Sequence, residues 1–191
     1  KHLQLLKLLM HMLFQQVYAF LQKMNNFNDK NHKIIAVDLD DSDLLIPSHE
    51  ALQERRVAIF DLLSENFFRP ILPKKVTNNI GPYRLHISIK EQLLVFKISN
   101  IENQLIREIL LSISPIRRIL KDYNEICLSY YNAVKRLAPS QIETIDMGRK
   151  AIHDEGGRIL LDRFNRKADM DFQTSRRLFT LITAIYLESS K

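Results

Sequence analysis

The chain has little glycine, one cysteine and no long apolar run, and each of these scarcities counts against a kind of site or protein. It also has no tryptophan. Four glycines in 191 residues leave little room for a phosphate-binding loop built from backbone N–H groups. A single cysteine, Cys127, excludes an internal disulfide framework, so we expect a reducing compartment, the cytoplasm. No stretch reaches the roughly 20 uninterrupted apolar residues of a membrane span, so we expect no membrane association of the folded domain.

Standard catalytic and metal-binding signatures are also missing. The chain contains no GxxxxGK(S/T) or GxGxxG pattern for holding phosphates, no GxSxG, no HExxH and no CxxC. We therefore expect no metal and no cofactor, and catalysis becomes less expected without being excluded.

What is present is the composition of an ordinary globular protein, with 46% hydrophobic and 26% charged residues. The length suits one domain. The formal net charge is +6, of which Lys1, Lys7 and Lys23 contribute three in a segment without acids, which leaves +3 for residues 24–191. This balance permits an anionic partner without requiring one.

Residues 1–23 differ from the rest of the chain because leucines and other apolar residues recur there at helical spacing between Gln and Lys. Met24 then opens a polar stretch. We interpret Met24 as the native start and residues 1–32 as a leader, disordered segment or upstream extension. The alternatives are an amphipathic helix on a membrane surface and a signal sequence, although no small-x-small cleavage site is present.

For residues 33–191 we predict a single α+β domain. Residues 83–89, 93–99 and 105–113 are typical of a three-stranded antiparallel meander, and the β-branched run 33–40 of a further strand in the same small sheet. An irregular loop is expected at 69–82. Four to five helices should cover the sheet, at residues 48–67, 114–137, 140–157, 158–164 and from 171 onwards.

Polar residues suited to capping predict where the helices begin. Ser48, Ser114 and Asp171 are expected N-caps, with Pro115 at the first position of its helix. Ser140 and Glu143 have the spacing of a capping box, and Gly156-Gly157 should end that helix. The first helix should bury Leu52, Ile59, Phe60, Leu63 and Phe67, and the last, strongly apolar helix should be the centre of the core.

Four phrases in order carry a family resemblance: PYRLHISI, RRILKDYNEICLSYY, IETIDMGRKAIHDEG and TSRRLFTLI. Over roughly residues 33–188 the chain resembles the alphaproteobacterial uncharacterised protein family 0262. The resemblance implies a soluble bacterial protein and supports Met24 as the native start. It implies no activity.

The helix 140–157 contains the candidate chemistry. Asp146, Arg149 and His153 are spaced by three and four residues, so they share one strip of helix surface. One interpretation is a structural Asp146–Arg149 ion pair beside a boundary histidine. The functional interpretation makes Asp146 and His153 catalytic, with Arg149 holding an anion. A metal site built from His153, His86 and a carboxylate is the least favoured alternative.

Further arginines are candidate anion ligands. Arg117 and Arg118 follow Ser114 at a helix start, where free N–H groups beside two guanidiniums favour an anion. Pairing with nearby acids is the alternative. Arg84 lies on a strand face with His86, Ser88 and Lys90 that is basic but lacks a ring for base stacking, so nucleic acid is weakly supported. The anion-binding candidates are Arg84, Ser114, Arg117, Arg118 and Arg149.

Two functions remain. The favoured one is a non-catalytic binding or regulatory protein that engages an anionic ligand or a protein partner through a basic surface. The alternative is an enzyme without standard motifs, a hydrolase or transferase acting on a phosphorylated metabolite through Asp146, Arg149 and His153. Strand 105–113 is apolar on both faces, which suits burial on both sides or a homodimer seam. Cys127 is expected to be a buried, inert thiol.

Overall fold

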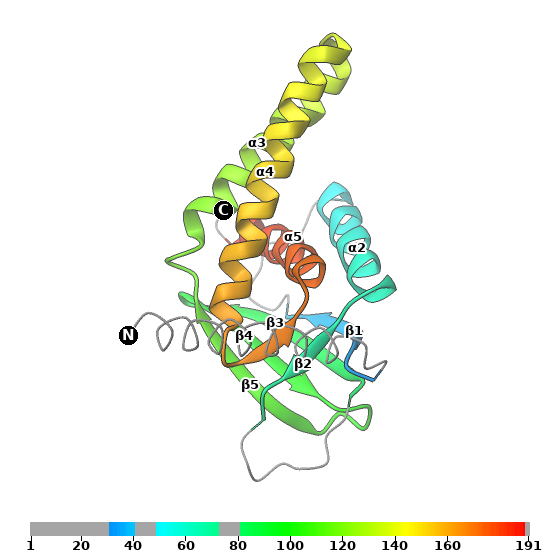
Figure 1. The fold of residues 1–191 in the computed structure, drawn as a ribbon, viewed down its shortest axis with the longest axis vertical. Coiled ribbons are helices and arrows are strands. Elements are labelled where there is room, and N and C mark those ends of the chain that lie inside the picture. Colours follow the sequence, from blue (N-terminus) through cyan, green and yellow to red (C-terminus); the bar gives the residue numbers. More distant parts are fainter. Residues whose placement is uncertain (1–30, 41–48, 73–80, 190–191) are drawn as a thin grey trace, which may run out of the picture.

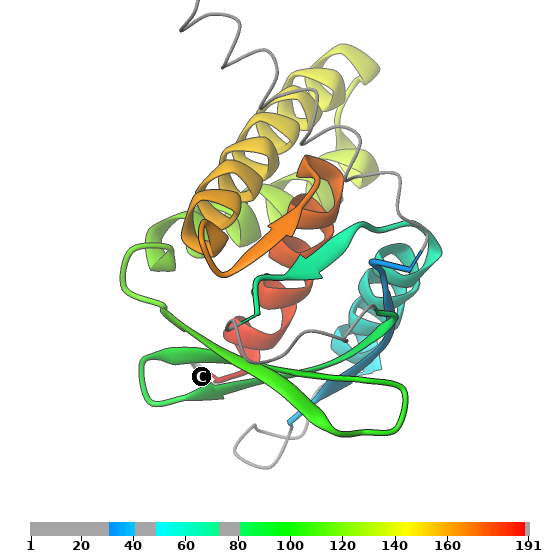
Figure 2. The ribbon, with the colours of Figure 1, turned by 60° about the horizontal axis from the view of Figure 1, so that its bottom comes forward.

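The computed structural model describes residues 31–40, 49–72 and 81–189, which form a sheet with helices on one of its faces (Figures 1 and 2). The predicted α+β class is confirmed. The strands β1 (Ile34–Leu39), β3 (Tyr83–Lys90), β4 (Leu93–Ser99) and β5 (Leu105–Ser112) lie in the order β1-β3-β4-β5. The last three form the predicted antiparallel meander, but β1 runs parallel to β3, so the sheet is mixed. The crossover through helix α2 (His49–Ser64) makes the parallel pairing geometrically feasible.

Helix α5 (Phe172–Ser189) is the centre of the core, as its sequence predicts. It packs between α2 and the helices α3 (Arg117–Arg136) and α4 (Pro139–Phe164), above the sheet (Figure 2). Asp171 is its N-cap, because the backbone N–H of Thr174 donates to Asp171 Oδ1 at 2.6 Å. Its buried apolar side chains are Leu178, Phe179, Leu181, Ile182, Ile185 and Tyr186.

Helices α3 and α4 form an antiparallel hairpin whose outer half projects from the rest of the molecule (Figure 1). Because of this projection, apolar side chains near the start of α3 are buried and several near its end are exposed. Leu120 and Tyr123 are buried, whereas Val134 and Leu137 near the tip are exposed.

The prediction that Gly156-Gly157 ends a helix is wrong. Helix α4 continues through both glycines to Phe164 and includes the separate short helix expected at 158–164. The reason is close packing. A β-carbon at residue 156 would overlap the ring of Phe179, and one at residue 157 would lie 2.7 Å from Cγ of Arg176. Glycine at these two positions permits α4 and α5 to pack closely, and it does not end the helix.

Two predicted helix starts also differ. Helix α3 begins at Arg117 after the N-cap Ile116, and Ser114 lies in the preceding turn without capping the helix. Helix α4 begins at Pro139, whose fixed φ suits a first helical position, and the backbone N–H of Ala138 donates to Gln141 Oε1 at 3.4 Å. The observed cap therefore uses Ala138 and Gln141, two residues before the predicted capping box of Ser140 and Glu143.

Burial differs from expectation in α2 and β5. Phe60, expected in the core, is 70% exposed, and Ala58 and Leu62 take the buried positions instead. Strand β5 is at the sheet edge with Leu105 and Leu110 exposed, so it is not buried on both faces.

A small antiparallel sheet was not predicted. It pairs β2 (Phe68–Pro70) with β6 (Ala168–Met170), and β2 occupies the first residues of the expected loop 69–82. The rest of that loop from 73 to 80, the proposed cap Ser48 and the segment 1–30 lie outside the described residues.

Candidate functional site

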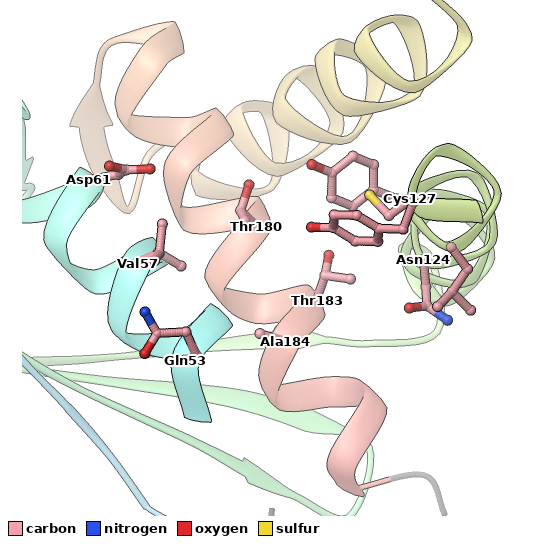
Figure 3. A pocket seen from close by; sticks show the side chains of 12 residues that line it. Gln53, Val57, Asp61, Asn124, Cys127, Thr180, Thr183 and Ala184 are labelled. Atoms are coloured by element: carbon pink, nitrogen blue, oxygen red, sulfur yellow. The ribbon is translucent and has the colours of Figure 1, made fainter. Parts of the chain in front are cut away.

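A groove between α2 and α3, with α5 as its floor, contains a cavity of about 310 Å³ (Figure 3). We call it the α2–α3 groove. Figure 3 shows Gln53, Val57 and Asp61 on one side, and Asn124 and Cys127 on the other. The remaining lining residues are Ala58, Tyr123, Leu128, Tyr131, Thr180, Thr183 and Ala184.

The periodicity of α2 and α3 creates this groove. On α3, residues 124, 127, 128, 131 and 134 recur at intervals of three and four and so share one face. The neighbouring face, which includes Tyr123 and Ala133, is buried within the fold. On α2, Gln53, Val57 and Asp61 are each separated by one turn, which places them along the opposite edge.

Both edges of the groove expose large apolar side chains. On α2, Val57 is 49% exposed, and on α3 Leu128 is 54% and Tyr131 51% exposed; Phe60 of α2, which does not line the groove, is 70% exposed. Val134, one turn after Tyr131, extends this strip toward the hairpin tip. Asp61 is the one charged side chain among the described lining residues. The groove thus combines exposed apolar side chains with neutral polar ones and one acidic position among the described residues.

The inner wall of the groove is supported by His153 of α4. Its ring stacks on Tyr123 with a centroid separation of 5.0 Å and an interplanar angle of 20°. Nε2 lies 2.9 Å from the hydroxyl of Thr180, itself a lining residue. His153 therefore contacts two residues of the groove without lining it.

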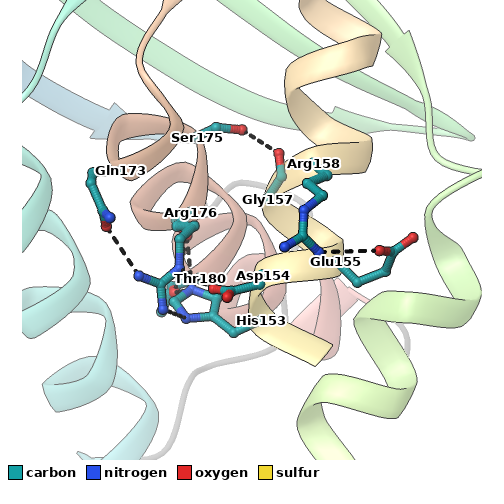
Figure 4. A network of polar contacts seen from close by, with 9 residues as sticks. All are labelled: His153, Asp154, Glu155, Gly157, Arg158, Gln173, Ser175, Arg176 and Thr180. Atoms are coloured by element: carbon teal, nitrogen blue, oxygen red, sulfur yellow. Dashed lines mark hydrogen bonds and ion pairs between the residues drawn. The ribbon is translucent and has the colours of Figure 1, made fainter. Parts of the chain in front are cut away.

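The hydrogen bonds of His153 require the neutral ring with its proton on Nε2 (Figure 4). A guanidinium can only donate, so Nδ1 accepts from Arg176 Nη2 at 3.1 Å. Nε2–H then donates to the Arg176 carbonyl oxygen, 3.0 Å away. Burial and the nearby Arg176 and Arg149 guanidiniums lower the pKa of His153, although the Arg176 carbonyl and Asp154 oppose this change.

Arg176 is itself held in place by α4. Its Nε lies 2.8 Å from Asp154 Oδ1 in an ion pair, and its Nη1 donates to Gln173 Oε1 at 3.0 Å. Next to it, Ser175 donates to the carbonyl oxygen of Gly157 at 2.7 Å. These bonds lock α4 against α5 directly behind the groove (Figure 4).

Tyr123 and Cys127 form the wall nearest to His153. Burial raises the pKa of Tyr123 to about 12, with Cys127 adding to the effect and the Thr180 hydroxyl opposing it. The phenol is therefore a neutral hydroxyl at physiological pH. Cys127 is half-buried and lines the groove, whereas the sequence predicts a buried thiol.

The predicted ion pair of Asp146 and Arg149 is present. Arg149 Nη2 lies 2.6 Å from Asp146 Oδ1, and Lys150 Nζ lies 2.7 Å from Asp146 Oδ2. These two cations, with Lys150 first, lower the pKa of Asp146 below its ordinary value. Arg149 also lies over the ring of Tyr130, 5.1 Å from its centroid. Asp146 thus pairs with cations on its own helix, and His153 is positioned by α5 instead.

The anion-binding candidates lie on several elements. Ser114, Arg117 and Arg118 line a shallow hollow at the start of α3, where Arg117 donates to Gln92 and Arg118 Nε lies 3.6 Å from Asp122. Arg84 lies on β3, in a different hollow. Neither hollow includes Arg149 or His153.

Other kinds of site find no support in the described part of the chain. Residues 31–40, 49–72 and 81–189 contain no group of three or more His, Cys, Asp or Glu side chains placed to hold a metal ion. Among the same residues, no helix combines the length and apolar character needed to cross a bilayer.

The sequence did not predict the groove. Val57, Leu128 and Tyr131 read as ordinary helix residues until α2 and α3 are placed on either side of α5. The available signal was the excess of apolar positions on α3, where positions 128, 131 and 134 add to the stripe that packs inside the fold.

Comparison with known proteins identifies the family but no activity. The model of the Uncharacterised protein family (UPF0262) matches residues 31–188. A UPF0262 protein of Dinoroseobacter shibae is 49% identical over 155 residues, covering 80% of this chain and 96% of the relative. One from Ruegeria sp. is 49% identical over 156 residues, covering 81% and 97%, and one from Paracoccus denitrificans is 47% identical, covering 81% and 95%. No solved structure shows a significant match. The chain belongs to the uncharacterised protein family UPF0262.

Proposed function

We propose that this protein is a non-catalytic binding protein that holds an amphipathic helix of a partner protein in the α2–α3 groove. The observation that carries the proposal is the exposure of large apolar side chains along both edges of the groove, Val57 on one side and Leu128 and Tyr131 on the other. Apolar surface of this kind marks interaction sites, and a cleft between two helices is a common seat for the apolar face of a third.

The extent of the apolar surface favours a protein segment over a small ligand. The cavity of about 310 Å³ is at the lower end of the range for small-molecule pockets, roughly 300–1,000 Å³. The exposed apolar side chains continue beyond it, to Phe60 on α2 and to Val134 on α3. A helix with apolar residues at intervals of three and four would cover the cavity and this border together.

Asp61 indicates the charge of the partner. It is the single charged side chain among the described lining residues, and covering it with apolar atoms alone would be destabilising. We therefore expect the partner helix to carry a lysine or arginine opposite Asp61, at the edge of its apolar face.

The contacts of His153 support binding over catalysis. Both of its ring nitrogens are bonded inside the protein, to Arg176 and Thr180, so neither is directed at a substrate. The histidine instead fixes Tyr123 and Thr180, which shape the groove wall.

The test replaces Val57 and Leu128 together with glutamate in the affinity-tagged full chain. Because both side chains are about half exposed, the unfolding free energy should stay within about 1 kcal/mol of the parent. The variant should lose a protein that the parent retains from an alphaproteobacterial lysate. Ser129→Glu, a change at an exposed position on the same helix that is not part of the groove lining, should retain it. Equal retention by the double variant would contradict the proposal.

A further inference from the structure

A second hollow, of about 340 Å³, lies beside β1, the start of β3 and the end of β4. Its polar lining consists of Asp38, Arg84, His86, Ser99 and Asn103. Along β3 the residues Tyr83, Leu85 and Ile87 are buried in the core, so Arg84 and His86 alternate with them on the face turned away from the helices. This hollow is therefore separate from the α2–α3 groove.

Arg84 differs from the other candidate arginines in this structure. Arg117 is bonded to Gln92, Arg118 is paired with Asp122, and Arg149 is paired with Asp146. The guanidinium of Arg84 makes no hydrogen bond or ion pair with any residue in the described ranges, although it lines a hollow. Its donors are available to a ligand.

Asp38 is the one acid among the described residues that line the hollow, and it is bonded to His86. Nδ1 of His86 lies 2.8 Å from Asp38 Oδ2, and Asp38 and His86 are direct partners in the β1–β3 pairing. This carboxylate therefore accepts a hydrogen bond from His86 and makes no ion pair with Arg84 in the described structure.

Neutral donors complete the hollow from two other segments. Ser99 is directly opposite Arg84 in the β3–β4 pair, so the two side chains share one face of the sheet. Asn103, in the turn between β4 and β5, adopts a left-handed backbone conformation with φ of 63° and contributes to the same lining. A guanidinium, a hydroxyl and an amide thus contribute to one lining.

We propose that this hollow binds a phosphate group, with Arg84 as its principal ligand and Ser99 and Asn103 as neutral donors. A carboxylate has two oxygens, which a guanidinium alone can satisfy, whereas a phosphate has acceptors on several sides and can use all three donors. The phosphate group is that of a small phosphomonoester or of free inorganic phosphate.

The test measures the affinity of the full chain for inorganic phosphate and for glycerol phosphate by calorimetry at matched ionic strength. Arg84→Met should weaken binding by about tenfold or more, because it removes charge-assisted donors. Ser99→Ala should weaken it several-fold. Arg118→Met, at an exposed arginine beside the other hollow, should leave it unchanged. Tighter binding of glycerol phosphate than of inorganic phosphate would identify a phosphomonoester site.

Three results would overturn the inference. The first is that the parent protein binds neither inorganic phosphate nor glycerol phosphate. The second is that Arg84→Met binds phosphate as tightly as the parent. The third is that Arg118→Met alone loses binding, which would place the site at the start of α3. Because the side chain of Arg84 is exposed and without a partner in the described structure, Arg84→Met should unfold at the parent's temperature when phosphate is absent.

Discussion

The imidazole of His153 shows how partners from another helix decide what a titratable side chain can do. Arg176 donates to Nδ1, so a proton on that atom would remove a hydrogen bond and place two cations together. Stacking on Tyr123 also limits its contact with water. The ring is therefore a neutral support for the groove wall, and protonation should weaken the fold.

This role predicts a pH dependence of stability. The pKa of His153 is lowered in the folded state from its ordinary value of 6.5. Between the two pKa values the unfolded chain binds more protons, so the contribution of His153 is complete above the unfolded pKa and is lost as pH falls through the folded pKa. His153→Gln lacks this contribution. The difference in unfolding free energy between parent and variant should narrow from about pH 7.5 to about pH 5.

Urea denaturation of both proteins across that range measures this difference. Since the other five histidines of the chain are present in both proteins, their titration cancels to first order. At neutral pH the variant should be less stable by about 1–2 kcal/mol, because it loses the stacked ring and part of the hydrogen-bond network. Two curves that stay parallel across the range would contradict a depressed pKa at His153.

At the scale of one element, α4 shows what local patterns can and cannot predict. The spacing of Asp146 and Arg149 predicted their ion pair, because both partners lie on one helix and the interval alone places them together. The partners of His153 come from α5, which no interval within α4 can reveal. Gly156-Gly157 predicts a helix end from sequence alone, and only the packing of α5 against these glycines shows that the helix continues.

In the other elements too, local patterns predict structure, whereas contacts between distant segments are not predicted. Strands β3, β4 and β5 were predicted because alternation and turn residues are local signals, and α5 because its apolar content allows only a central place. The groove, the parallel pairing of β1 and the small β2–β6 sheet depend on contacts between distant segments. Phe60 reads as a core residue by type, and only the packing of α2 shows that it faces outward.

The glycines of α4 supply an element-scale prediction with a matched control. Gly156→Ala should destabilise the protein by about 1–3 kcal/mol, because the added methyl group overlaps the Phe179 ring in a packed core. At Gly148 a β-carbon would lie 3.8 Å from Cδ1 of Ile126, an ordinary contact. Gly148→Ala should therefore stabilise α4, by up to about 1 kcal/mol. Chemical denaturation checks both, and equal effects of the two substitutions would show that α4 and α5 are less closely packed than described.

At the scale of the molecule, the two proposed sites belong to different parts of the fold. The α2–α3 groove lies among the helices, and the Arg84 hollow lies on the outer face of the sheet. They share no lining residue. We therefore expect the double variant with Val57→Glu and Leu128→Glu to bind phosphate with an affinity within twofold of the parent's. We expect Arg84→Met to retain the protein partner. Calorimetry and partner retention on the same two preparations test this independence, and a loss of both activities in either variant would contradict it.

A helix held in the α2–α3 groove, as proposed, would contact Leu128. A photo-reactive amino acid placed at Leu128 in the full chain, followed by sequencing of the crosslinked peptide, tests this contact; the same group at Ser129 is the control. We expect Leu128 to react with one segment of a partner protein, with apolar residues at intervals of three and four and a lysine or arginine placed to reach Asp61. Ser129 should give no such product. Equal crosslinking from both positions, or a crosslinked segment from a second copy of this chain, would contradict the account.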